Sequence, residues 1–328
     1  MYIETLTKLN GEKLNTWKSF LTEADLLPDL SVDKTVLVWD DSELIACGSR
    51  KDNVLKCIAV SKKHQGENLT ATVITALRQD AFSSGFNHLF LYTKPEKEEI
   101  FSSLFFYPVA RTDKVLLLES KRDGIISFLN SLPQKESDGV TGSIVMNCNP
   151  FTLGHQYLIE TASKGCEHLY VFCVSEDKSE FSFADRFEMI KLGTAHLKNV
   201  SVLPTGPYLI SSATFPDYFL KDREKKEEIH CLLDVEIFTK YYAPYFSINR
   251  RYVGTEPISK ATDMYNKALK EHLPKSGIEL KEIKRLECDS TPISASKVRE
   301  IINSGDKESL KPLLPQTTYD YLIEKNLI

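Results

Sequence analysis

One short run of this sequence, residues 149–155, combines a backbone pattern and side chains that could hold a phosphate group. It reads N-P-F-T-L-G-H, follows an apolar segment at 142–148, and opens a segment whose apolar residues recur at helical spacing. The first N–H groups of a helix lack partners within the helix, and its dipole is positive at that end, so such a junction attracts anions. His155 adds a titratable donor in the first turn. The run therefore predicts a phosphate site, although a lone histidine there can also serve only as a capping residue.

A second candidate lies far downstream, where residues 292–299 read P-I-S-A-S-K-V-R and lead into a helix. Ser294 or Ser296 can cap that helix, because a hydroxyl oxygen can accept from an unpaired N–H of the first turn. Lys297 and Arg299 fall in that first turn, where the helix dipole disfavours cations. Two cations at a helix start are explained if an anion binds there. The alternative is an ordinary serine-capped helix with solvated basic side chains.

The elements that must position these segments form two blocks, separated by a polar stretch with Pro and Gly at 131–139. From about residue 140, strand and helix patterns alternate, which predicts a Rossmann-like parallel sheet with its ligand at the carboxyl ends of the strands. The expected strands are 144–147, 169–174, 200–203, 251–253 and 279–283. The expected helices are one ending near 162, one at 184–196 with Ser182 as its cap, one at 262–272, and one starting at 294. We therefore expect an α/β protein with domains at 1–132 and 140–328.

The first block predicts a smaller α+β domain. Its expected elements are a helix at 14–20, a hairpin of 36–39 and 44–47, a strand at 55–60, a helix at 69–82, and strands at 89–92 and 115–118. This order resembles the GNAT-type acyltransferase fold, in which a Q/R-x-x-G-x-G/A loop binds the pyrophosphate of coenzyme A. Gln65 fits that loop, but Asn68 and Thr70 occupy its small-residue positions. We expect this domain to dock a carrier protein or its phosphopantetheine-type arm and not to transfer acetyl itself.

Composition narrows the functional classes. The formal net charge of -5 gives no electrostatic reason to expect nucleic acid as the principal partner. No run approaches the roughly 18 apolar residues of a membrane span, and the N-terminus lacks signal-peptide features. None of the seven histidines lies four residues from another, so no protein-built metal site is expected. The seven cysteines include no C-x-x-C pair and are expected to be reduced core residues of a cytoplasmic protein.

Together, the two phosphate-binding candidates resemble the paired motifs of the nucleotidyltransferase superfamily, T-x-G-H early and a degenerate I-S-S-T-x-x-R late. With both blocks included, the whole chain resembles the citrate lyase ligase family, most specifically at 149–155, 206–216, 218–221, 253–257 and 293–299. The resemblance implies that ATP and acetate give acetyl-AMP and pyrophosphate. The acetyl group then passes to the thiol of the prosthetic group on the citrate lyase acyl carrier protein, with release of AMP.

The resemblance also implies roles for individual residues. His155 is expected to donate to an α- or β-phosphate oxygen, and Thr152 to hold the same region. Arg299, with Ser294 and Ser296, is expected to stabilise pyrophosphate as it leaves, while Mg²⁺ bridges phosphate oxygens. Residues 210–216 are expected to line the acetate or thiol pocket. The other expected nucleotide contacts are Asn147, Asn149, Pro150, Phe151, Gly154, Arg186, Gly254, Thr255, Glu256 and Lys297.

Two other functions stay open at this point. A nucleotidyltransferase of the same superfamily could act on a phosphate ester of the phosphopantetheine, NMN or FMN type, leaving a product with a pyrophosphate-linked nucleotide. A non-catalytic protein could instead bind a coenzyme-A-like arm through the first block. The family-like segments favour the ligase, which releases AMP.

Overall fold

The computed structural model describes residues 1–210, 215–220, 226–255, 260–289 and 291–328. The chain divides into two compact units. The first comprises Met1–Ser127 and Thr214–Glu236, and the second comprises Phe128–Ala213 and Ile237–Ile328. The sequence predicts two consecutive domains. In the structure, the later segment Thr214–Glu236 belongs to the N-terminal unit. Glu256 and most of the segment 210–216 lie outside the described residues.

The first unit contains a seven-stranded sheet in the order β1-β2-β3-β4-β5-β7-β6. Its strands are β1 (Tyr2–Leu6), β2 (Lys34–Asp40), β3 (Glu43–Lys51), β4 (Val54–Val60), β5 (Phe90–Thr93), β6 (Tyr107–Arg111) and β7 (Leu116–Glu119). All neighbours are antiparallel except β4 and β5, which pair in parallel over only two positions. The helices are α1 (Gly11–Glu23), α2 (Leu69–Ser83) and α3 (Glu98–Ser102), with 3-10 turns at Lys62–His64 and Pro95–Lys97. The predicted hairpin, helices and central strands are confirmed, and β1 and β6 are additional.

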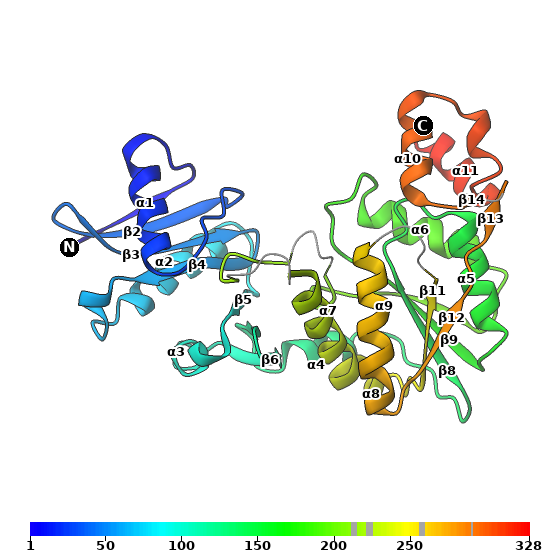
Figure 1. Ribbon diagram of the computed structural model, residues 1–328, viewed down its shortest axis with the longest axis horizontal. Helices are drawn as coiled ribbons and strands as arrows, with labels where there is room; N and C mark the ends of the chain where they lie inside the picture. Colours follow the sequence, from blue (N-terminus) through cyan, green and yellow to red (C-terminus); the bar gives the residue numbers. More distant parts are fainter. Residues whose placement is uncertain (211–214, 221–225, 256–259, 290) are drawn as a thin grey trace. The chain divides into compact units, whose positions relative to one another are not determined.

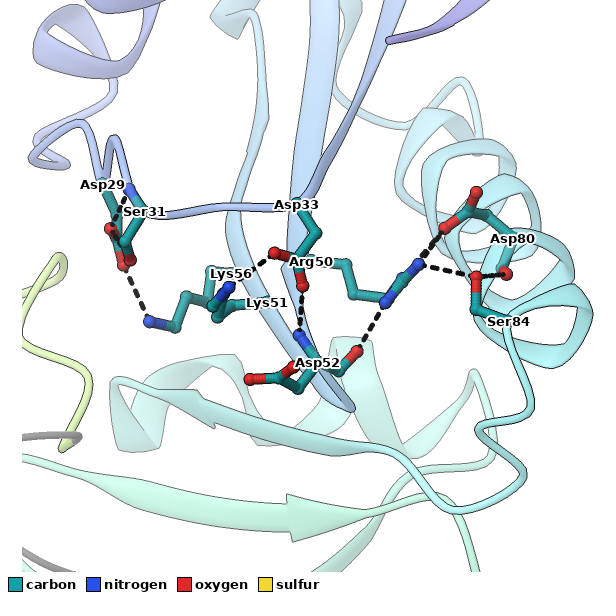
Figure 2. A network of polar contacts seen from close by, with 9 residues as sticks. All are labelled: Asp29, Ser31, Asp33, Arg50, Lys51, Asp52, Lys56, Asp80 and Ser84. Carbon is teal, nitrogen blue, oxygen red and sulfur yellow. Dashed lines mark hydrogen bonds and ion pairs between the residues drawn. The ribbon is translucent and has the colours of Figure 1, made fainter. Parts of the chain in front are cut away.

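A polar network ties the sheet of the first unit to helix α2 (Figure 2). Arg50 of β3 is only 3% exposed, and it donates from Nε and Nη2 to Asp80 of α2 at 2.9 and 2.5 Å. Its Nη1 donates to the carbonyl oxygen of Asp52, and its Nη2 also reaches Ser84. This buried guanidinium is therefore neutralised by a carboxylate and makes four hydrogen bonds.

The second unit is built on a five-stranded sheet in the order β10-β9-β8-β11-β12, in which all neighbours are parallel. Its strands are β8 (Thr141–Met146), β9 (His168–Cys173), β10 (Val200–Pro204), β11 (Arg250–Gly254) and β12 (Glu279–Ile283). The helices of this unit are α5 (Leu153–Ser163), α6 (Phe183–Thr194), α9 (Lys260–His272), α10 (Ala295–Ser304) and α11 (Gln316–Glu324). The predicted parallel α/β sheet and its helices are confirmed. Strand order reverses between β8 and β11, and open sheets of this kind bind ligands at that point, outside the carboxyl ends of the strands.

Shorter elements complete the chain. They are α4 (Gly124–Asn130), α7 (Lys226–Ile237), a π-helical turn (Phe238–Tyr242), α8 (Ala243–Tyr245), 3-10 turns at Leu273–Ser276 and Glu308–Leu310, and a two-stranded ladder of β13 (Glu287–Cys288) and β14 (Thr291–Pro292). Helix α11 packs against α6, and a hydrogen bond from Tyr321 to Asp185 at 2.8 Å joins the two helices (Figure 1). Within the described ranges, no helix combines the length and apolar character that crossing a bilayer requires.

Candidate functional site

A pocket of about 480 Å³ lies at the switch point of the second sheet. Strands β8 and β11 are adjacent there. β8 runs into the T-x-G-H motif, and β11 ends at Gly254 and leads into Thr255, both predicted nucleotide contacts. The chemistry-bearing part of the lining is Thr152, Gly154, His155, Arg251, Gly254, Tyr265, Asn266, Lys284, Arg285, Ser294 and Ser296. The pocket therefore contains residues of both predicted motifs, which are about 140 positions apart in the sequence.

Thr152 and His155 form a reciprocal cap at the start of α5. Thr152 is the N-cap residue, and its hydroxyl oxygen accepts from the His155 N–H at 3.4 Å. In return, the backbone N–H of Thr152 donates to Nδ1 of His155 at 3.1 Å, and the Thr152 hydroxyl lies 2.9 Å from the same nitrogen. Because Nδ1 accepts, the neutral ring carries its proton on Nε2. The cap thus fixes both the orientation and the tautomer of His155.

The environment of His155 keeps its ring uncharged. Burial, together with the positive charge of Arg285, lowers the pKa of His155 from 6.5 to about 4. The ring also stacks on Phe151, with centroids 5.9 Å apart and an interplanar angle of 17°. At neutral pH the side chain is therefore a preoriented neutral donor rather than a cation or a general base.

The start of α10 is brought against the start of α5. Ser294 is the N-cap residue, accepting from the Lys297 N–H at 3.4 Å, which resolves the choice between the two candidate serines. A Cβ atom on Gly154 would lie 3.4 Å from the carbonyl oxygen of Ile293, an ordinary van der Waals distance, so the residue before Ser294 packs against the first turn of α5. Both helices therefore present their N-termini to one pocket, where their dipoles favour an anion.

Arg299 links the two motifs from beside the pocket. Its Nη1 donates to the carbonyl oxygen of Asn149 at 2.5 Å, and its Nη2 donates to Ser296 at 3.2 Å. Its Nε lies 3.6 Å from a carboxylate oxygen of Glu180. Lys297 is exposed, and neither cation belongs to the pocket lining.

Arg186 has a different environment from the other predicted nucleotide contacts. It is 0% exposed and donates to the carbonyl oxygens of Asn147, Val174, Glu176 and Phe181. It therefore fixes the backbone that follows β8 and β9. Asn147 in turn accepts from Arg186 at 2.7 Å, so these two side chains support the loop below the motif and are not part of the pocket lining.

Several predicted residues of the first motif also act on the backbone. The amide oxygen of Asn149 accepts from the Phe181 N–H at 3.0 Å, and the Asn149–Pro150 peptide is cis. Pro150 and Phe151 are buried, and Phe151 packs against Gly193 of α6. These residues hold the turn in place, while Thr152, Gly154 and His155 face the pocket.

Sequence reasoning missed two arginines of the lining, Arg251 and Arg285. Arg285 donates from Nε to the carbonyl oxygen of Thr255 at 2.8 Å, and its backbone N–H donates to the Thr255 hydroxyl at 3.3 Å. Thr255 thus positions a cation beside Gly254, at the carboxyl edge of the sheet. One feature of the sequence could have identified Arg285 as a lining residue: it follows the strand β12, just as the T-x-G-H run follows the strand β8.

The described part of the lining is electropositive. It includes Arg251, Lys284 and Arg285, and no Asp or Glu. Among the described residues, no group of three or more His, Cys, Asp or Glu side chains could hold a metal ion. The pocket therefore suits a polyanion whose own oxygens would carry any cation.

Comparisons with known proteins identify relatives of this chain. Residues 141–322 match the family model described as the citrate lyase ligase C-terminal domain. The "[Citrate [pro-3S]-lyase] ligase" of Klebsiella pneumoniae is 37% identical over 93% of this chain and 91% of its own length, and that of Escherichia coli K12 is 37% identical over 95% and 91%. A crystal structure of Thermotoga maritima TmcAL bound with alpha-thio ATP is similar at 15% identity and a TM-score of 0.35, covering 57% of this chain and 55% of that one.

Proposed function

Because this chain belongs to the citrate lyase ligase family, we propose that it activates citrate lyase by acetylating the acyl carrier protein of that enzyme, with ATP and acetate as co-substrates. The protein is then an acid–thiol ligase that forms AMP. The cytoplasmic location expected from the reduced, core-packed cysteines is part of this proposal.

The proposed reaction has two steps. A carboxylate oxygen of acetate attacks the α-phosphorus of ATP, the bond to the β-phosphate breaks, and pyrophosphate leaves with its electron pair. The carrier thiol, losing its proton to solvent, then attacks the acetyl carbon of acetyl-AMP, and AMP leaves. The first step concentrates negative charge on phosphoryl oxygens, so fixed positive charge and alignment are the main catalytic requirements.

The pocket supplies both requirements. His155 donates from Nε2–H to an α- or β-phosphate oxygen, with Nδ1 held by the Thr152 backbone. The N-terminus of α10, capped by Ser294, and the guanidinium of Arg285 hold the phosphates that depart as pyrophosphate. Mg²⁺ would be held by the nucleotide phosphates and water, since the described lining supplies no carboxylate, and would neutralise charge on the leaving group.

One observation carries this proposal: two motifs far apart in the sequence share a single pocket whose described lining contains cations and no carboxylate. Family membership favours the ligase over a transferase acting on a phosphate ester. The roles of Asn149, Gly154, Gly254 and Lys297 toward the nucleotide remain predictions.

The test is incubation of the full chain with ATP, Mg²⁺, acetate and the thiol form of the citrate lyase carrier. We expect equal amounts of AMP and acetyl-carrier, and exchange of labelled pyrophosphate into ATP that depends on acetate. Formation of a stable dinucleotide from a phosphate ester, without acetate-dependent exchange, would replace the ligase by the rival transferase.

A further inference from the structure

Arg251 is a buried cation that forms no ion pair with any described residue. It is 1% exposed, and its Nε and Nη1 atoms have no hydrogen-bond partner within the part of the chain that the structure describes. Its Nη2 lies 3.5 Å from the Tyr265 hydroxyl, which is a marginal contact. The guanidinium carbon lies 4.4 Å from the ring centroid of Phe238, a cation–π contact that supplies no hydrogen-bond acceptor.

Such an arrangement is unfavourable in the ligand-free protein. A guanidinium has five N–H donors and stays charged, so burying it without acceptors sacrifices its hydration. The other fully buried arginine of the second unit, Arg186, avoids this cost by donating to four carbonyl oxygens. The burial of Arg251 with unpaired N–H groups is explained if a bound ligand supplies the missing acceptors.

The position of Arg251 indicates which part of a ligand it would meet. It lines the pocket from the second residue of β11, three residues before Gly254, which places it about 10 Å below the carboxyl edge at about 3.3 Å per strand residue. The helix N-termini and Arg285 lie at the carboxyl edge of the sheet, where phosphates are expected to bind. Arg251 is in contact with the ring of Phe238 and the hydroxyl of Tyr265, and Tyr265 also lines the pocket. This environment suits a small acid with an apolar tail.

We propose that Arg251 is the subsite for the carboxylate of the acid substrate, an inference that rests on the proposed function. One edge of the guanidinium donates two parallel N–H bonds to the carboxylate. This geometry neutralises the buried charge and turns the acid toward the α-phosphate held at the edge above. Arg251 therefore binds and orients the nucleophile.

The experiment compares Arg251→Met with Arg250→Met in acetate-dependent ATP–pyrophosphate exchange. Arg250 is the matched control, because it is the preceding residue of the same strand, its guanidinium pairs with Glu279 at 2.6 Å, and it does not line the pocket. We expect Arg251→Met to raise the KM for acetate by about 30-fold or more, as for loss of a charge-assisted bidentate contact, with the KM for ATP changed by less than about 3-fold. Arg250→Met should leave both values unchanged, and Arg251→Lys, which retains a point charge, should fall between Arg251→Met and the wild type.

Thermal unfolding supplies a readout independent of turnover. Removing an unpaired buried charge should leave the Tm of Arg251→Met equal to or above that of the wild type, whereas a structural role would lower it. Sodium acetate, compared with sodium chloride at equal ionic strength, should raise the Tm of the wild type and not that of Arg251→Met.

The outcomes separate this inference from the proposed function. If the wild type shows no acetate-dependent exchange, the ligase function fails, while the acetate-dependent change in Tm still decides whether Arg251 binds a carboxylate. If exchange occurs but the KM for acetate is unchanged in Arg251→Met, the subsite is wrong. A selective rise in the KM for ATP would overturn it too, because Arg251 would then contact phosphate. Failure of Arg251→Met to fold while Arg251→Lys folds with an unchanged KM for acetate would make Arg251 structural.

Discussion

Buried arginines on the two sheets have opposite surroundings. Arg50, on β3 of the first unit, donates to Asp80, to Ser84 and to the carbonyl oxygen of Asp52 (Figure 2). Arg251, on β11 of the second unit, is equally buried, yet its Nε and Nη1 atoms have no partner among the described residues. The first arrangement is complete in the folded chain, and the second is complete only with a bound anion. The difference distinguishes a cation that stabilises the fold from one kept for a ligand.

Arg50→Met should have the largest effect on stability. Removing the guanidinium leaves Asp80, whose side chain is 17% exposed, without its main partner, and we expect the free energy of unfolding to fall by about 4 kcal/mol. Urea unfolding followed by tryptophan fluorescence reports on this unit, because both tryptophans, Trp17 and Trp39, belong to it. The double variant Arg50→Met/Asp80→Leu should regain most of the loss. An Arg50→Met protein as stable as the wild type would remove the contrast with Arg251.

His155→Ala should have the largest effect on catalysis. Loss of the preoriented Nε2–H donor should lower acetyl-AMP formation by about 10²-fold or more, the scale of removing one hydrogen bond to a developing oxyanion. His196→Ala is the matched control, since His196 lies on the surface and pairs with Glu160 at 3.0 Å, and it should retain full activity. Normal turnover by His155→Ala would exclude this histidine from the mechanism.

Protonation of His155 gives the pocket a pH dependence of its own. Its pKa in the folded protein is about 4, below the 6.5 of an exposed histidine, so the unfolded chain binds this proton first. The contribution of the neutral ring is therefore complete above pH 6.5 and is lost as the pH falls from 6.5 to 4. Over this window we expect the wild type to lose about 2 kcal/mol more stability than His155→Gln, at about 1.4 kcal/mol per pKa unit and allowing for partial exposure. Parallel pH–stability curves for the two proteins would contradict the assignment.

Charge reversal in the first unit should have the smallest effect. Lys62 and Lys63 are exposed just before α2, near the loop expected to meet the carrier arm. The double variant Lys62→Glu/Lys63→Glu should raise the KM for the carrier about 5-fold and leave acetate-dependent exchange unchanged, because rim charges contribute modestly and act mainly on association. A matched Lys164→Glu/Lys198→Glu variant of the second unit should leave the KM for the carrier unchanged. If both variants behave alike, the first unit does not dock the carrier through this surface.

Much of the second unit followed from local pattern. The strand at 279–283 and the helix cap at Ser182 are confirmed as predicted, because a period-2 or period-3.6 pattern and a capping hydroxyl act over a few residues. The return of Thr214–Glu236 to the first unit could not be predicted in this way. Its packing depends on surfaces that form only when distant strands have assembled.

The candidate site shows the same division. The two helix starts were predicted from their residues. The role of Arg186 as a hydrogen-bond donor to the backbone was not predicted, because its four carbonyl partners come together only in the folded chain. Arg285 was missed because no local motif surrounds it, and it reaches the pocket only through the parallel pairing of β11 with β12.

The sequence by itself determined the α/β class of the second unit and the two capped helix starts that favour an anion. It also placed Arg250 and Arg251 side by side on a strand, without distinguishing them. Successive strand residues point to opposite faces, and only the packing of the sheet decides which partners each face meets. Tertiary structure alone therefore paired Arg250 with Glu279 and left Nε and Nη1 of the buried Arg251 without an acceptor among the described residues.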